Sequence, residues 1–169
     1  LHDFTGRSRK PQIALAAEFG FDEFAQPAGG CCFLTDESYS KKLVDLWRAR
    51  GKKDYELDDI MLLKVGRHIR PQANYKIIVA RDEGEGRFLQ GYKNDFISLH
   101  CESHPGPLVL VDGTPSAEDL FVAAKVTARY GQGRDAEQVE VAIRTPDGLE
   151  RMIQVTPFQA DEIPQAWYL

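Results

Sequence analysis

The spacing of apolar residues changes near residue 60, and this change constrains the fold of the chain more than any other feature. Upstream, Tyr39, Leu43, Leu46 and Trp47 recur at the intervals of one helix face. Downstream, short apolar runs alternate with glycine- and proline-containing turns, which is typical of strands. We therefore predict an α+β fold: an N-terminal helical segment, then a mainly antiparallel sheet with one or two packed helices.

Local start and stop signals place the elements. We expect one helix over residues 9–19 and a second from a cap at Thr35 or Asp36 to Gly51. A third helix should start at a capping-box sequence that begins at Ser116. The expected strands cover 61–65, 67–70, 75–80, 96–101, 108–111, 139–144 and 151–156.

The remaining segments set the expected domain boundaries. Residues 51–59 are predicted to be a connector. Residues 82–92 are predicted to form a poor helix, because Gly84 and Gly86 each cost about 1 kcal/mol relative to alanine. We expect a helical segment and linker at 1–54, a second domain at 55–157 and a tail at 158–169.

The charge distribution indicates where a polyanion would bind. The net charge is −5, which gives no general case for nucleic-acid binding. Residues 1–80 hold 13 basic and 11 acidic side chains, whereas residues 81–169 hold 8 and 15. Any RNA contact is therefore expected to favour the first half of the chain.

Composition also bears on the cellular setting. No apolar run is long enough to cross a bilayer and no signal peptide is visible, so no membrane partner is expected. Three cysteines form no disulfide framework, which favours a reducing compartment and hence the cytoplasm. Because the chain begins with Leu1, we expect it to be part of a longer polypeptide.

A cysteine pair precedes the second predicted helix. Cys31 and Cys32 follow Pro27, Gly29 and Gly30 and lie close to the expected helix N-terminus, where the dipole lowers a thiol's pKa. Cys31 is therefore a candidate nucleophile for sulfur transfer. A tight turn with two buried, inert cysteines is the alternative.

Two other kinds of site are not predicted. His100, Glu102 and His104 share one strand face, but Cys101 points to the other and no fourth zinc ligand is evident, so no metal site is expected. The chain also lacks a recognisable phosphate loop, so no bound cofactor is expected.

Basic residues near aromatic ones are typical of RNA-binding surfaces, because guanidinium groups bind phosphates and aromatic rings stack on unpaired bases. Tyr75 and Tyr92 lie near such residues, and Lys125 and Arg129 are four apart on one helix. A solvated strand face is the alternative. The candidate RNA-binding residues are Arg67, His68, Arg70, Lys76, Arg81, Lys125 and Arg129.

Several blocks carry a family resemblance. They are residues 5–12, 14–20, the Pro-Ala-Gly-Gly-Cys sequence at 27–31 with its following leucine and Thr-Asp, and 63–70. These blocks resemble the end of the thiolation domain in PP-loop tRNA thiouridine synthases that carry an extra C-terminal module. That module resembles the NFACT-R-like RNA-binding domain, and the likeness extends to about Thr156.

The resemblance implies an RNA-binding module, with tRNA as the RNA, in a tRNA uridine-thiolation enzyme. ATP with magnesium would bind an upstream domain of the parent protein, so this chain would be inactive alone. Cys31 matches the family's cysteine, whereas Gln26 stands where many relatives have a second one. A sulfur-donor protein would be a possible partner, and Arg7, Arg9 and Lys10 a possible substrate loop.

Two other functions remain open at this stage. The module could be a protein-docking or dimerisation domain of the same enzyme, which the modest net charge favours. Alternatively, the chain could be a fragment whose main role is to carry the sulfur-transfer cysteine Cys31. The sequence does not define the oligomeric state.

Overall fold

The computed structural model describes residues 10–21, 33 and 36–169, and the chain divides into two compact units, residues 1–32 and 33–169. In the first unit, helix α1 (Lys10–Glu18) confirms the predicted helix.

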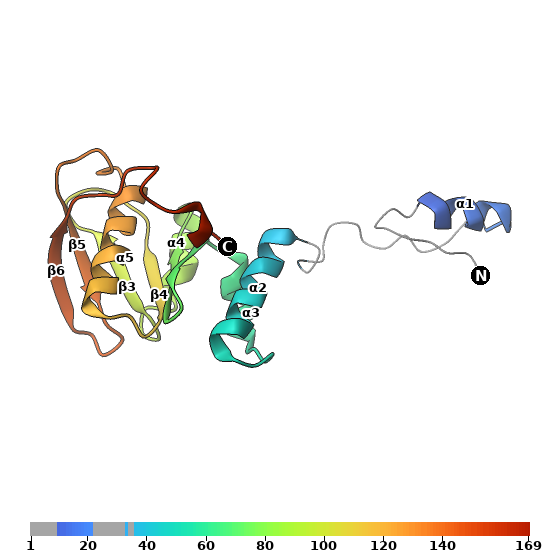
Figure 1. The fold of residues 1–169 in the computed structure, drawn as a ribbon, viewed down its shortest axis with the longest axis horizontal. Helices are drawn as coiled ribbons and strands as arrows, with labels where there is room; N and C mark the ends of the chain where they lie inside the picture. The colour runs from blue at the N-terminus through green and yellow to red at the C-terminus, as the bar shows by residue number, and fades with distance from the viewer. Residues whose placement is uncertain (1–9, 22–32, 34–35) are drawn as a thin grey trace. The chain divides into compact units, whose positions relative to one another are not determined.

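The second unit is built around one antiparallel sheet, shown in Figure 1. Within the described residues the strand order is β1-β2-β4-β3-β5-β6, and each neighbouring pair is antiparallel. The strands are β1 (Arg67–Gln72), β2 (Tyr75–Val79), β3 (Ile97–Cys101), β4 (Val109–Gly113), β5 (Val139–Arg144) and β6 (Glu150–Val155). The predicted α+β fold is therefore confirmed.

Helix α5 (Ala117–Tyr130) lies across one face of this sheet and completes the main core (Figure 1). Strand alternation places Ile69, Ile77 and Leu99 in this core, where they are fully buried. The helix contributes the small residues Ala123 and Ala124, which let it lie close to the strands. Each large apolar side chain buried here contributes about 1.5–3 kcal/mol relative to an exposed one.

The start of α5 follows from the predicted capping box. The Ser116 hydroxyl accepts a hydrogen bond from the Asp119 amide at 3.1 Å, and the Asp119 carboxylate accepts one from the Ser116 amide at 2.9 Å. Two amides at the helix start are thereby satisfied.

Three helices lie toward the other side of the sheet. Helices α3 (Leu57–Lys64) and α4 (Glu83–Gln90) bury Leu62 and Leu89 against Ile78 of β2. Helix α2 (Glu37–Arg50) packs on α3, with Leu43 and Leu63 in one buried apolar cluster.

Both ends of α2 agree with the prediction from the sequence. The Asp36 side chain accepts a hydrogen bond from the Tyr39 amide at 2.7 Å, which caps the start of the helix. Gly51 ends the helix with a φ of 69°, a left-handed conformation that costs glycine little.

Two segments differ from the expectation. Residues 61–65 were expected to form a strand but belong largely to α3, which begins at a capping box between Glu56 and Asp59. A short apolar run fits a buried helix as well as a strand, and this is why the prediction was wrong. Helix α4 forms despite its two glycines, because Asp82 caps it and Leu89 is buried.

The expected boundaries after residues 54 and 157 both fall inside the 33–169 unit. The packing of α2 on α3 crosses the expected boundary after residue 54. After the expected boundary at residue 157, Ile163 joins the main core and Tyr168 forms a β-bridge with Ile69 of β1. The Leu169 amide also donates a hydrogen bond to the His68 carbonyl at 3.1 Å, so the last residues pack against β1.

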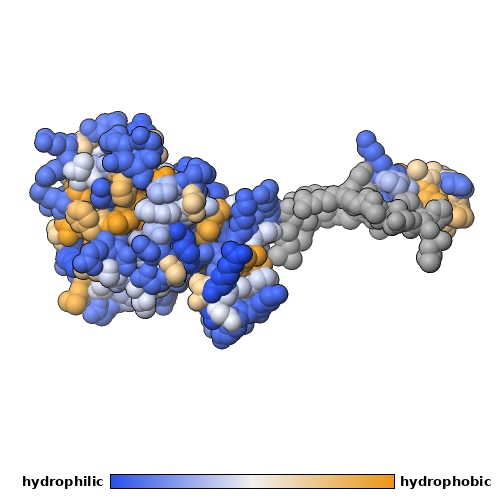
Figure 2. Space-filling model, in the orientation of Figure 1, coloured by the Kyte–Doolittle hydropathy of each residue, from blue (hydrophilic) through white to orange (hydrophobic). Residues whose placement is uncertain are grey.

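The visible surface of the 33–169 unit is mainly hydrophilic, with separate hydrophobic patches (Figure 2). Among the residues that the structure describes, no helix has the length and apolar character needed to span a membrane.

An ion pair joins α2 to β1. The Arg70 guanidinium makes two hydrogen bonds to the Asp45 carboxylate, one of them at 2.7 Å, and both side chains are largely buried. Removing one partner of such a pair leaves an uncompensated charge in a site of low dielectric constant.

We predict that Asp45→Ala lowers the free energy of unfolding by about 3 kcal/mol, as measured by urea denaturation. The control is Glu83→Ala, which removes the exposed Glu83–Arg87 pair and should cost less than about 1 kcal/mol. Equal losses in the two variants would contradict a special role for the buried pair.

Candidate nucleic-acid interface

Strand alternation separates the predicted RNA-binding residues of β1 into two groups. Arg67 lies on the same face as Ile69 and contacts α5, whereas His68 and Arg70 face α3 and α2. The first group lies on the surface beside α5, and the second enters an internal polar network.

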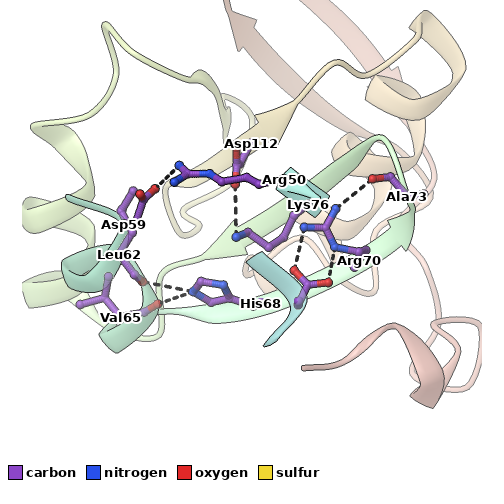
Figure 3. A network of polar contacts seen from close by, with 10 residues as sticks. Arg50, Asp59, Leu62, Val65, His68, Arg70, Ala73, Lys76 and Asp112 are labelled. Atoms are coloured by element: carbon purple, nitrogen blue, oxygen red, sulfur yellow. Dashed lines mark hydrogen bonds and ion pairs between the residues drawn. The ribbon is translucent and has the colours of Figure 1, made fainter. Parts of the chain in front are cut away.

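His68 belongs to the internal group, as Figure 3 shows. Its Nε2 lies 3.2 Å from the Leu62 carbonyl oxygen and 3.0 Å from that of Val65. Carbonyls only accept hydrogen bonds, so Nε2 carries the proton. Burial, and then the charges of Lys76 and Lys42, hold the pKa of His68 well below its usual value, so the ring is neutral at pH 7.

Lys76 and Arg70 are also committed to partners inside the unit (Figure 3). Lys76 is 3% exposed and its ammonium lies 3.2 Å from the Asp112 carboxylate. Arg70 pairs with Asp45 and also donates a hydrogen bond to the Ala73 carbonyl at 3.3 Å. His68, Arg70 and Lys76 therefore direct their polar atoms to partners inside the unit.

The other group lies around α5. The Arg67 guanidinium lies 5.1 Å from the centre of the Tyr130 ring, and the Lys125 ammonium lies 4.0 Å from that of Phe158. The Tyr130 and Tyr168 hydroxyls are 2.8 Å apart. We call this region the α5 surface and define it by Arg67, Lys125, Arg129, Tyr130, Phe158 and Tyr168.

The α5 surface carries uncompensated positive charge. In the described part of the chain, Arg67, Lys125 and Arg129 form no ion pair with a carboxylate. Burial and the hydrogen bond between the Tyr130 and Tyr168 hydroxyls raise the pKa of Tyr130, although the charges of Arg67 and Arg129 act in the opposite direction. The Tyr130 hydroxyl therefore stays protonated at neutral pH.

The combination of cations and aromatic rings on the α5 surface is suited to binding a nucleic-acid strand. Cations without carboxylate partners attract phosphates, and aromatic rings offer a surface for bases. A cation held over a ring also has fewer conformations to lose on binding. The sequence suggested Arg67, Lys125 and Arg129, whereas Phe158 and Tyr168 were missed because they lie in the expected tail.

Arg81 is exposed and follows β2, and its guanidinium lies 3.8 Å from Glu85. Because Arg67 pairs with Val79 in the sheet, Arg67 and Arg81 lie toward the same end of the sheet. Arg81 lines a pocket of about 170 Å³ with residues of α2 and α3.

Lys42 lines this pocket and is 3% exposed. Its ammonium donates hydrogen bonds to the carbonyl oxygens of Leu63 at 3.3 Å and Gly66 at 3.2 Å. Burial lowers the pKa of Lys42 to about 8. The charges of Arg81 and Lys76 act in the same direction, and those of Glu85 and Asp36 oppose it.

The other candidate residues do not form a second site among the described residues. His100 Nε2 lies 2.5 Å from the Glu102 carboxylate, but the described part of the chain holds no cluster of three or more potential metal ligands. Burial raises the pKa of the Cys101 thiol to about 11. Lys10 is exposed at the start of α1, while Arg7, Arg9 and Cys31 lie outside the described residues.

Comparison with known proteins defines the class of this domain. Residues 66–168 match the family model described as the NFACT protein RNA binding domain. This match covers more than half of the chain, which therefore belongs to that family of RNA-binding domains.

A solved structure supports the fold. The C-terminal part of the fibronectin/fibrinogen-binding protein from Streptococcus suis superposes with a TM-score of 0.52 at 19% sequence identity. The alignment covers 77% of this chain and 58% of that one, so this chain spans little more than half of its relative. No match was found among curated proteins.

The buried ammonium makes stability depend on pH. The pKa of Lys42 is lower in the folded state than in the unfolded chain, so the unfolded chain binds more protons above about pH 8. Relative to Lys42→Met, the wild type should therefore gain about 2 kcal/mol of stability between about pH 7 and pH 9.5.

Urea denaturation at several pH values measures this gain. Lys41→Met is the matched control, because it removes an exposed ammonium from the same helix, and the pH dependence of Lys42→Met is compared with it. If the difference in free energy of unfolding between the wild type and Lys42→Met does not change with pH, the Lys42 ammonium is not destabilised by burial.

Proposed function

We propose that this domain binds RNA through the α5 surface. The observation that carries the proposal is the gathering of Arg67, Lys125 and Arg129, three cations without a carboxylate partner in the described part of the chain, beside aromatic rings. These cations would contact phosphates, and Tyr168 and Phe158 would support bases or sugars.

We further propose that the RNA is tRNA and that the domain serves a tRNA uridine-thiolation enzyme in the cytoplasm. The support is the resemblance of residues 5–12 and 27–31 to the end of a PP-loop thiolation domain. Holding the tRNA through a second domain raises the effective concentration of the target uridine at an upstream active site. ATP with magnesium would act in that upstream domain.

Within this proposal, Cys31 would accept or release sulfur, and Arg7, Arg9 and Lys10 would help to hold the substrate. A nucleophilic thiolate needs a partner that donates or accepts the sulfur atom, and a sulfur-donor protein would supply it.

The α5 surface can be tested by its salt dependence. We predict that Lys125→Ala/Arg129→Ala weakens tRNA binding at low salt, and that each lost phosphate contact flattens the slope of log K against log salt by about 0.7–0.9. Fluorescence anisotropy over a salt series measures both quantities.

The control is Lys52→Ala/Arg87→Ala, which removes the same charge from exposed cations that already pair with Asp54 and Glu83. The control should keep the wild-type slope. Wild-type affinity and slope in Lys125→Ala/Arg129→Ala would exclude the α5 surface. Equal affinity for tRNA and for an unstructured RNA of the same length would count against tRNA as the ligand.

The sulfur-transfer part of the proposal predicts that the thiols differ in reactivity. In variants that retain one cysteine, Cys31 should react with iodoacetamide faster than Cys101 at neutral pH, because burial raises the pKa of Cys101 to about 11. Rates measured across pH give the pKa of each thiol. Equal rates, or a pKa for Cys31 at or above the free value of about 8.5, would contradict an activated thiolate.

A further inference from the structure

The pocket beside Arg81 differs from the α5 surface in shape and chemistry. Its walls come from α2 and the residues before it, from α3 and from the segment after β2, and its volume is about 170 Å³. Since a water molecule takes up about 30 Å³ in the liquid, this volume would hold several waters or one small polyatomic anion. The lining residues are Phe33, Asp36, Ser38, Tyr39, Lys42, Leu63, Lys64 and Arg81.

Three cations line this small volume. Lys64 lies 4.5 Å from the centre of the Phe33 ring, and neither Lys64 nor Lys42 has a carboxylate within ion-pair distance in the described part of the chain. Among the described residues, the Arg81 guanidinium has one ion-pair contact, at 3.8 Å to the Glu85 carboxylate. Asp36 is the one carboxylate among the described lining residues, and its charge offsets part of that of the three cations, so the lining keeps an excess of positive charge.

Lys42 provides the second, independent observation. An ammonium has three N–H donors, and two of them reach the Leu63 and Gly66 carbonyls. The third has no partner within the described residues, although the side chain is 97% buried and lines the pocket. A buried cation with an unused donor gains more from an added anion than an exposed cation does.

We propose that this pocket binds a phosphate monoester group, with Lys42, Lys64 and Arg81 as its ligands. The group has two possible sources, the 5′-phosphate of an RNA strand or a free nucleoside monophosphate. Arg81 can donate two parallel hydrogen bonds to phosphate oxygens, while Lys42 and Lys64 act as single-point donors.

Charge favours a monoester over an internal phosphodiester. A monoester carries close to two negative charges at neutral pH, whereas a diester carries one, so the three lining cations gain more from the monoester. The α5 surface would bind phosphates within an RNA strand, whereas the pocket would bind a terminal or free phosphate. The two sites can therefore act independently.

Affinity for paired RNAs tests the proposal. We expect the wild type to bind a 5′-phosphorylated RNA about tenfold more tightly than the same RNA with a 5′-hydroxyl, or to bind adenosine monophosphate with a comparable gain over adenosine. Arg81→Gln and Lys64→Gln should each reduce this preference. Arg87→Gln, which changes an exposed arginine outside the pocket, should retain it.

Calorimetry with sulfate provides a readout for Lys42. Near pH 8 the bound dianion should raise the pKa of Lys42, so binding takes up a proton and the observed enthalpy depends on the ionisation enthalpy of the buffer. Sulfate itself does not titrate there, and Lys42→Met should abolish the proton uptake.

The outcomes distinguish the sources and the two proposals. A preference for 5′-phosphorylated RNA that depends on Arg81 identifies the RNA end as the source. An Arg81-dependent preference for the mononucleotide alone identifies the free phosphate. If neither preference exists, or if Arg87→Gln abolishes it equally, the proposed site is wrong. The 5′-hydroxyl RNA reports on the α5 surface alone, so failure of RNA binding there is measured separately.

Discussion

The ion pair between Asp45 and Arg70 is the constraint on which much of this unit depends. It fixes α2 against β1, at the edge of the face of the sheet that α5 leaves open. Buried charges are tolerated only with close partners, and this requirement ties α2 to one position along β1. His68 adds a second connection, since its neutral ring donates to carbonyls at the end of α3.

This junction determines which cations remain available for a ligand. Arg70 and Lys76 are paired with Asp45 and Asp112, so neither can bind phosphate without losing a partner. Arg67 precedes Arg70 on the same strand but lies on the opposite face of β1, where it contacts Tyr130. The proposed RNA-binding surface thus depends on the alternation of side chains along a single strand.

The domain presents two basic regions toward one end of its sheet, despite the net charge of −5 for the chain. The α5 surface carries aromatic rings, whereas the region at Lys42 is a small pocket. Local positive regions attract phosphates even when the total charge is negative, because salt screens the more distant carboxylates. Binding by such a surface is expected to be sensitive to salt.

The sequence by itself determined the elements whose signals are local. The cap at Asp36, the stop at Gly51 and the capping box at Ser116 each involve residues within one turn, and all three were predicted. The helical spacing of Lys125 and Arg129 was likewise sufficient to place both on one side of α5.

Only the tertiary structure decided which basic residues reach the surface. His68, Arg70 and Lys76 resemble Arg67 in sequence, but their partners Leu62, Asp45 and Asp112 come from other elements, and the helix at 57–64 was predicted in part as a strand. Phe158 and Tyr168 join the α5 surface from the end of the chain for the same reason. Burial and pairing are set by contacts between distant segments, and local residue spacing contains no information about which face of a strand another element will cover.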